Sequence, residues 1–386
     1  MPMRTLRNMD VREKRVLVRV DFNVPLENGR ITDDFRLVTA LPTIRYLCEQ
    51  RAKVILISHL GRPEGKVVPQ LKLDPVAKRL EELLNQKVYK ADDCIGPAVA
   101  ALIADLAPGE VALLENLRFY SEEEKNDPTF ARELASLADC YVNDAFSAAH
   151  RAHASIEGVA RLLPSAAGFL LEQEVKALSV VAKHPAHPFV VILGGAKISD
   201  KIGVINNLID QADHVLIGGG MAFTFLKAKG LEIGKSLVEP DRLTYAQELL
   251  ARAKEKIVLP VDVVISEQIN GKSPIQEVPV EAIPAGWMGL DIGPVTRQTF
   301  AEFLATAQTV FWNGPMGVFE VPVFAKGTQA VAQAMAANPG TTIIGGGDTA
   351  AAVSDYADRF THISTGGGAS LEFLEGRQLP GIAVLE

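Results

Sequence analysis

Short apolar segments rich in β-branched residues recur along the chain, and stretches with a helical spacing of apolar positions lie between many of them. The clearest apolar segments are Arg15–Val20, Lys53–Ile57, Val111–Leu114, Tyr141–Val142, Phe189–Leu193, His214–Ile217, Val261–Ile265, Thr309–Trp312, Thr341–Ile344 and His362–Ser364. Most are continuously apolar rather than alternating, which is typical of strands buried on both faces of a parallel sheet. Strands that alternate with helices predict an α/β protein with mostly parallel sheets.

Local signals indicate where individual helices and turns begin or end. Asp74-Pro75 and Asp127-Pro128 each predict a helix start, because Asp accepts backbone N–H groups as the N-cap and Pro fits the first helical position. The stretch from Phe169 to Lys183 predicts one amphipathic helix, which the following proline-rich segment ends. The Asn-Gly pair at 270–271 predicts a hairpin within residues 261–284.

Length and composition bound the class of protein. The 386 residues favour two domains, with the boundary in or beside the helix over 169–183. A net charge of -8 argues against general binding to nucleic acid or to an anionic membrane, and no apolar run reaches the roughly 18 residues of a membrane span. Cys48, Cys94 and Cys140 lack any CxxC spacing, so we expect buried thiols in a reducing cytoplasm.

Polar and basic residues follow the predicted strands of the first half. In open parallel sheets, ligands bind beyond the carboxyl ends of the strands. Each arginine taken alone is better explained as a solvated or salt-bridged surface residue, but several at one rim indicate a small polyanionic ligand, which Arg recognises well. The basic residues expected to converge are Arg19, Arg36, His59, Arg62, Arg118 and Arg151.

Glycine-rich turns follow the predicted strands of the second half, at 194–195, 218–220, 345–347 and 366–368. Glycine permits a close approach of backbone to ligand, and a helix N-terminus attracts phosphate. Lys197 and Lys201 are expected at a helix start on one face, where a nucleotide phosphate chain or solvent balances them. Asp348 is either an ordinary N-cap or a ligand of Mg²⁺ on a nucleotide.

Several common nucleotide motifs are missing. The sequence contains no G-x-x-x-x-G-K-[ST], and no G-x-G-x-x-G follows the first strand of either half. A nicotinamide-dependent dehydrogenase is therefore disfavoured. A non-catalytic nucleotide-binding regulator or scaffold is a further alternative, although such a protein would be free to lose one of the two candidate half-sites.

The chain resembles the phosphoglycerate kinase family from end to end. The matching segments are Arg19-Val20-Asp21-Phe22-Asn23-Val24-Pro25, Ser58-His59-Leu60-Gly61-Arg62-Pro63, Glu115-Asn116-Leu117-Arg118-Phe119, Asn143-Asp144-Ala145-Phe146, Ala149-His150-Arg151-Ala152-His153, Gly194-Gly195-Ala196-Lys197, Gly286 to Pro294, Trp312-Asn313-Gly314-Pro315 and Gly345-Gly346-Gly347-Asp348-Thr349. The resemblance implies two Rossmann-like, doubly wound domains joined by a helix, with a cleft between them. It implies a phosphoglycerate-binding domain over 1–168, the helix over 169–185, a nucleotide-binding domain over 186–370 and a tail over 371–386 that returns to the first domain.

The resemblance also implies the site residues. The phosphoglycerate site would comprise Asp21, Asn23, Arg36, His59, Arg62, Arg118 and Arg151. The nucleotide site would comprise Gly195, Lys197, Lys201, Met288, Gly289, Leu290, Asn313, Glu320, Gly346, Gly347, Asp348 and Thr349, with Asp348 as the metal contact. Arg36, Lys197, Gly347 and Gly367 would hold the transferring group.

The implied reaction is the glycolytic transfer of a phosphoryl group from 1,3-bisphosphoglycerate to MgADP, which yields 3-phosphoglycerate and ATP. Because the acceptor in the reverse direction is an ionised carboxylate, the reaction needs positioning and charge neutralisation rather than a general base. We expect closure of the two domains about the connecting helix, in a cytoplasmic monomer that acts on small molecules and binds neither nucleic acid nor membrane.

Overall fold

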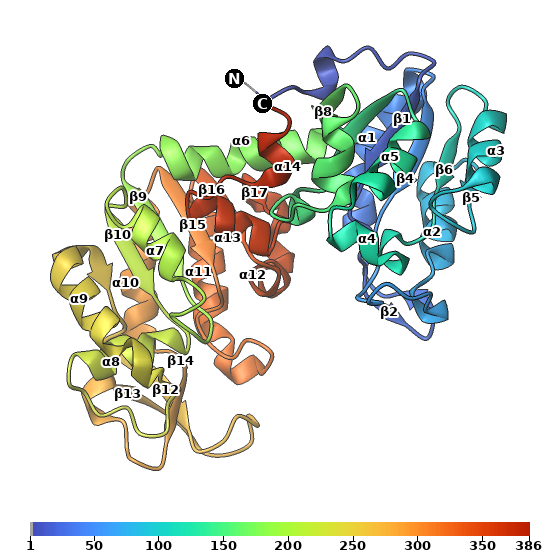
Figure 1. The fold of residues 1–386 in the computed structure, drawn as a ribbon. Coiled ribbons are helices and arrows are strands. Elements are labelled where there is room, and N and C mark those ends of the chain that lie inside the picture. The colour runs from blue at the N-terminus through green and yellow to red at the C-terminus, as the bar shows by residue number, and fades with distance from the viewer. Residues whose placement is uncertain (1–2) are drawn as a thin grey trace. The chain divides into compact units, whose positions relative to one another are not determined.

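The computed structural model describes residues 3–386, drawn in Figure 1. The chain forms two compact units, and each is built on its own parallel sheet. One unit holds the chain up to Lys176 together with Gln378–Glu386, and the other holds Ala177–Arg377. The division between them falls inside α6 (Phe169–Lys183), whose bounds agree with the helix that the sequence predicts.

The first unit contains a six-stranded parallel sheet in the order β5-β6-β4-β1-β7-β8. Its strands are β1 (Arg15–Arg19), β4 (Lys53–Ile57), β5 (Val88–Lys90), β6 (Val111–Leu113), β7 (Cys140–Asn143) and β8 (Ser165–Ala167). A small antiparallel hairpin adds β2 (Leu26–Glu27) and β3 (Arg30–Ile31). The helices of this unit are α1 (Phe35–Glu49), α2 (Asp74–Leu84), α3 (Pro97–Asp105), α4 (Ser121–Glu124), α5 (Pro128–Ser136) and α14 (Pro380–Ala383).

Strand β1 explains why these strands are continuously apolar. Val16 and Val18 belong to one buried cluster, whereas Leu17 belongs to another. Because successive side chains of a strand point to opposite faces, a sheet covered on both faces needs apolar residues at every position. The pattern therefore records burial on both faces, as the sequence predicts.

The second unit contains a six-stranded parallel sheet in the order β11-β10-β9-β15-β16-β17. Its strands are β9 (Phe189–Leu193), β10 (His214–Ile217), β11 (Ile257–Val258), β15 (Thr309–Asn313), β16 (Thr341–Gly345) and β17 (His362–Ile363). An antiparallel sheet adds β12 (Asp262–Ser266), β13 (Ile275–Pro279) and β14 (Met288–Ile292). The helices of this unit are α7 (Ile202–Leu208), α8 (Met221–Ala228), α9 (Leu243–Ala253), α10 (Pro294–Thr306), α11 (Lys326–Ala336), α12 (Gly347–Ala352) and α13 (Gly368–Leu374).

The α/β fold class with two parallel-sheet units is confirmed, and all of the strands expected from the sequence occur. The strand expected at Val261–Ile265 is not part of a parallel sheet. It forms β12, which pairs antiparallel with β13 in the hairpin around Asn270-Gly271. The short strand β8 could not be predicted from the sequence. Its Ser-Ala-Ala sequence has no β-branched residue, and the segment is a strand only because it pairs with β7.

One of the two expected helix caps forms as predicted. The Asp127 carboxylate accepts hydrogen bonds from the N–H groups of Thr129 and Phe130 and caps α5. The expectation that Asp74 caps α2 is wrong, because the helix already includes Asp74 and its N-cap is Leu73. The Leu73 N–H donates to the buried carboxylate of Glu115 at 2.9 Å.

The end of the chain packs within the first unit. The Gly381 N–H donates to the Ala149 carbonyl at 2.9 Å, and the Arg4 N–H donates to the Leu385 carbonyl at 2.9 Å. Residues 371–377, which the sequence analysis includes in the tail, lie in the second unit, where the Asn207 side chain donates to the Leu374 carbonyl at the end of α13. Among the described residues, no helix is both long enough and apolar enough to cross a membrane.

Candidate functional site

The polar residues expected at strand ends in the first unit share one edge of its sheet. Asp21 and Asn23 follow β1, His59 and Arg62 follow β4, Arg118 follows β6, and Arg151 follows β7. Strands β6, β4, β1 and β7 are neighbours in that order. Since parallel strands end at the same edge, the sheet gathers these groups, and Arg36 joins them from α1.

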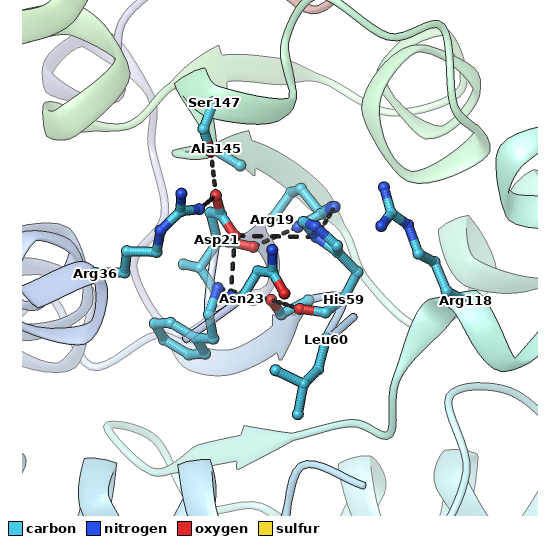
Figure 2. A network of polar contacts seen from close by, with 12 residues as sticks. Arg19, Asp21, Asn23, Arg36, His59, Leu60, Arg118, Ala145 and Ser147 are labelled. Atoms are coloured by element: carbon cyan, nitrogen blue, oxygen red, sulfur yellow. Dashed lines mark hydrogen bonds and ion pairs between the residues drawn. The ribbon is translucent and has the colours of Figure 1, made fainter. Parts of the chain in front are cut away.

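Asp21 is the centre of this cluster, as Figure 2 shows. Its carboxylate pairs with the Arg36 guanidinium and also accepts hydrogen bonds from the Ser147 hydroxyl and from the Asn23 N–H. Burial by itself would raise the pKa of Asp21, but its electrostatic interactions with His59 and with the Arg36 guanidinium, together with these hydrogen bonds, lower it below its ordinary value. Asp21 is therefore a buried anion that holds Arg36 at the edge of the sheet.

Asn23 and Arg118 are linked through the backbone of Gly61. The Gly61 N–H donates to Asn23 Oδ1 at 2.9 Å, and Arg118 Nη1 donates to the Gly61 carbonyl at 2.8 Å. Burial lowers the pKa of the Arg118 guanidinium from its ordinary value, and the nearby positive charges of Arg151 and Arg19 lower it further. This concentration of positive charge favours binding of an anion.

The remaining expected basic residues lie in different surroundings. Arg62 is exposed on the loop that follows β4, and Arg151 is half-buried, with Nε 3.2 Å from His150 Nε2. Arg19 differs from the expectation that it converges with the others on a ligand. Its side chain is fully buried, and its nitrogens bond to the Val20 carbonyl, to Ser155 Oγ and to His59 Nδ1.

Sequence reasoning missed the residues that support this cluster. Ser147 bonds to Asp21, and Glu123 is a fully buried carboxylate that accepts from Ser155 N and Oγ. Glu123 belongs to a run of three glutamates, a pattern typical of a solvated helix. No local signal marks it, because its partners come from segments distant in the sequence.

The second unit contains a cavity of about 490 Å³ above the glycine-rich strand ends. Its walls are largely apolar and include Phe223, Met288, Leu290, Val318 and Phe319. Of the residues expected at a nucleotide site, those that line it are Gly195, Met288, Gly289, Leu290, Glu320 and Asp348. An apolar cavity with a few carboxylates at its wall is typical of a small-molecule site.

Glycine is required where the loops beneath this cavity meet. A Cβ on Gly194 would lie 2.2 Å from the Pro315 carbonyl oxygen, and one on Gly314, whose φ is +98°, would lie 2.3 Å from the Gly194 carbonyl group. The Gly195 N–H donates to the Pro315 carbonyl at 2.9 Å. The loops after β9 and β15 therefore touch through their backbones, which only glycine allows.

The two lysines after β9 are not arranged as the sequence predicts. Helix α7 begins at Ile202, so Lys201 is its N-cap and Lys197 lies in the preceding turn rather than on a shared helix face. Lys201 Nζ donates to Asn313 Oδ1 at the end of β15, and burial lowers the pKa of this ammonium group. Lys197 is exposed. The turn is held by Glu239, which accepts from the N–H groups of Ile198 and Ser199 and which sequence reasoning also missed.

Asp348 is not an N-cap, contrary to one of the two expectations for it. The N-cap of α12 is Gly346, with a φ of +90°, and Asp348 is an exposed carboxylate in the first turn of the helix. Its charge acts on the Lys201 ammonium group. Thr349 is buried, and its Oγ1 accepts from the Gly314 N–H at 2.7 Å. Gly347 follows β16, and Gly367 follows β17 as the N-cap of α13.

Asp291, a buried carboxyl at the cavity, makes the stability of the fold depend on pH. Burial raises the pKa of this carboxyl to about 7, although the N–H groups of Gly327 and Ile292 donate to it. The unfolded chain has a pKa of about 3.9 at this group. The folded state therefore binds the proton more strongly, and this contribution to stability is present at low pH and lost as pH rises through about 7.

Asp291→Asn should remove that dependence. We expect the free energy of unfolding of the variant, relative to that of the wild type, to increase by up to a few kcal/mol between about pH 5 and pH 8. Chemical denaturation at a series of pH values measures this difference. Parallel curves for the two proteins would show that Asp291 does not titrate in this range.

Comparison with known proteins relates this arrangement to one family. The family model "Phosphoglycerate kinase" matches residues 6–377. A phosphoglycerate kinase from Moorella thermoacetica is 60% identical over 386 residues, which cover 99% of this chain and 98% of the relative. One from Rubrobacter xylanophilus is 57% identical over 387 residues, which cover 100% and 98%.

Solved structures agree with the sequence comparison. The structure of phosphoglycerate kinase from Coxiella burnetii has a TM-score of 0.91 and 43% identity and covers 100% of this chain and 99% of its own. That of phosphoglycerate kinase from Pyrococcus horikoshii has a TM-score of 0.89 and 37% identity, with coverage of 99% and 98%. The expected family and kinase activity are confirmed, and we conclude that this chain belongs to the phosphoglycerate kinase family.

Proposed function

We propose that the chain catalyses the reversible transfer of a phosphoryl group from 1,3-bisphosphoglycerate to MgADP, with 3-phosphoglycerate and ATP as products. The observation that carries the proposal is the chemical contrast between the two units of a phosphoglycerate kinase family member. One gathers arginines at the edge of its sheet, and the other has an apolar cavity above glycine-rich loops. The basic edge suits the phosphoglycerate, and the cavity suits the nucleotide.

In the first unit, each polar group has a definite part in holding the anionic substrate. Arg36 and Arg118 supply positive charge at a partly dry site, where charge-assisted hydrogen bonds are strong. Asp21 and Asn23 orient this set by holding Arg36 and Gly61. Arg62 and Arg151, the more accessible guanidinium groups, bind the outer phosphate, and His59 binds the polar middle of the substrate.

In the second unit, the cavity holds the adenine ring, and the turns beside it hold the phosphates. Met288, Gly289 and Leu290 contact the ring, and Glu320 contacts the ribose. Lys201 is fixed by Asn313 and binds a phosphate that does not move. Lys197 lies in a turn and follows the transferring phosphoryl group, together with Arg36 and the N–H groups at Gly347 and Gly367.

Magnesium enters with the nucleotide as part of the substrate. Asp348 is an exposed carboxylate at the cavity, and one carboxylate plus phosphate oxygens is a common ligand set for Mg²⁺. Among residues 3–386, no group of three or more His, Cys, Asp or Glu side chains is placed to hold a metal by itself. The donor set therefore fits an ion that is bound largely by the nucleotide.

The chemistry follows from this set of groups. Phosphoryl transfer depends on in-line positioning and on neutralising the oxygen charges, and the carboxylate acceptor of the reverse direction is already ionised. The residues for the two substrates belong to separate units, so we propose a closed state, reached by bending at α6, in which water is excluded. We further propose that the chain works as a cytoplasmic monomer.

A coupled assay tests the function directly. The purified chain, given 1,3-bisphosphoglycerate and MgADP, should form ATP, and the reverse reaction should consume ATP with 3-phosphoglycerate. The absence of turnover in both directions, with both ligands bound in calorimetry, would favour a non-catalytic binding protein. Enhancement of NAD(P)H fluorescence by the chain would favour a dehydrogenase instead.

Asp348→Asn tests the metal contact. We expect the variant to bind MgADP much more weakly than the wild type, while its affinity for metal-free ADP stays nearly the same, because the lost carboxylate acts through the ion. Titration calorimetry with and without Mg²⁺ measures both affinities. Asp355→Asn, at another exposed aspartate just beyond α12, is the matched control. Equal affinity of Asp348→Asn and wild type for MgADP would leave Asp348 with only a favourable interaction with the helix dipole.

A further inference from the structure

Arg19 and His59 form a buried pair, of which the proposed mechanism uses His59 but gives Arg19 no role. Arg19 Nη2 lies 3.1 Å from His59 Nδ1, and both side chains are buried. Figure 2 shows the Arg19 guanidinium beside the His59 ring. Two basic side chains in direct contact repel each other if both are charged, so one of them is neutral.

The chemistry of the two groups determines which of the two side chains is neutral. A guanidinium has only N–H donors and stays protonated in proteins. A hydrogen bond between the two therefore requires that His59 Nδ1 accepts, which leaves this nitrogen without a proton. The remaining proton of the neutral ring is then on Nε2. No hydrogen-bond partner lies on Nε2 within the described part of the chain, so this N–H is available to a ligand.

A second set of contacts holds Arg19 in place. Its Nε donates to Ser155 Oγ at 2.9 Å, and that hydroxyl donates onward to Glu123 Oε1 at 2.5 Å. Glu123 Oε2 accepts from the Ser155 N–H at 2.9 Å. Burial raises the pKa of Glu123, whereas the charge of Arg19 and the hydrogen bonds from Ser155 lower it and favour the ionised form. We assign Glu123 as the carboxylate that balances the buried charge of Arg19.

All but one of the charged groups around His59 favour the neutral ring. Burial lowers the pKa of His59 well below its ordinary value, and the positive charges of Arg19, Arg118 and Arg36 lower it further. Asp21 opposes them, with Oδ1 at 4.0 Å from His59 Nδ1. Protonation at Nδ1 would strengthen this contact with Asp21, but it would set an N–H against the Arg19 N–H.

We propose that Arg19 is a positioning residue that holds His59 as the neutral Nε2–H tautomer, with Ser155 and Glu123 as its supports. His59 then presents a hydrogen-bond donor of fixed direction and no charge, and the negative charge of the ligand is met by arginines alone. That the ligand is a phosphoglycerate rests on the proposed function, whereas the state of His59 does not. The affinity for the ligand therefore does not change with pH near neutrality, as it would if His59 titrated like an ordinary histidine.

The test is to observe the ring of His59 in the full chain, without ligand, by long-range ¹H–¹⁵N correlation NMR of ¹⁵N-histidine-labelled protein. His59→Gln assigns the signals by their loss. We expect an unprotonated Nδ1 and a protonated Nε2, unchanged between about pH 5.5 and pH 8. In Arg19→Met, the fixed tautomer should be lost, and the pKa of His59 should rise toward about 6.5.

Two further variants make the test decisive. Ser155→Ala removes the link between Arg19 and Glu123 at little cost in shape, so it reports on the same effect if Arg19→Met does not fold, with a smaller upward shift of the pKa. Arg15→Met is the matched control, because Arg15 lies on the same strand and pairs with Asp139 at the surface. The control should reproduce the wild-type spectrum.

The outcomes separate the two proposals. A proton on Nδ1, ordinary titration near about pH 6.5 in the wild type, or a spectrum unchanged in both Arg19→Met and Ser155→Ala would overturn the role of Arg19. The ratio of the 3-phosphoglycerate affinities of Ser155→Ala and wild type should rise as pH falls, because His59 then gains a charge that attracts the anion. A chain with the expected tautomer and no kinase activity would refute only the proposed function.

Discussion

Lys197→Ala should lower turnover by about 10²–10³-fold while the dissociation constants for ADP and 3-phosphoglycerate stay near those of the wild type. Lys197 is exposed in the turn between β9 and α7, where its ammonium group has room to follow a moving phosphoryl group. If it meets the transferring oxygens mainly in the transition state, its loss raises the barrier by roughly 3–4 kcal/mol without weakening ground-state binding.

The neighbouring lysine provides the contrast. Lys201 is held by Asn313 and is half-buried, so Lys201→Ala should weaken nucleotide binding more than turnover. Lys272→Ala, at the exposed tip of the β12–β13 hairpin, controls for the loss of one positive charge. Steady-state kinetics and separate calorimetric affinities distinguish these effects. If Lys197→Ala loses only nucleotide affinity at unchanged turnover, Lys197 is a binding residue and its catalytic assignment is wrong.

Arg36→Ala should reduce turnover by a similar factor of about 10²–10³, since it removes a preorganised positive charge from the proposed transfer site. It should also destabilise the fold by about 1–3 kcal/mol, because Asp21 is left as a buried carboxylate without its ion partner. The depressed pKa of Asp21 stabilises the wild type above about pH 4, and this contribution is lost as pH falls below that value. The variant should lose part of that pH dependence, because Arg36 is one of several groups that lower the pKa of Asp21.

A second substitution separates activity from stability. In Arg36→Ala/Asp21→Asn, the buried charge is gone, so the free energy of unfolding should recover in part while turnover stays low. Arg45→Ala, on the same helix and at the surface, is the control for helix α1. Recovery of turnover in the double variant would show that Arg36 acts only by neutralising Asp21, and the catalytic assignment would then be wrong.

The sequence by itself was sufficient for the features that depend on local burial and local chemistry. Continuous apolar strands such as Phe189–Leu193 were predictable because burial on both faces of a sheet leaves its pattern in adjacent residues. The helix Phe169–Lys183 was predictable from its own spacing and from the prolines after it. Residues at strand ends were predictable as a group, because the direction of parallel strands brings those ends to one edge.

Tertiary structure decided what each of those residues does. Arg19 and Arg36 look alike in the sequence, yet Arg19 is buried against Ser155 and His59 while Arg36 reaches the edge beside Asp21. Glu123 looks like a solvated residue, but it is buried because segments distant in the sequence enclose it. The charge, tautomer and accessibility of a polar group depend on neighbours brought by the fold, and these neighbours leave no periodic signal in the chain.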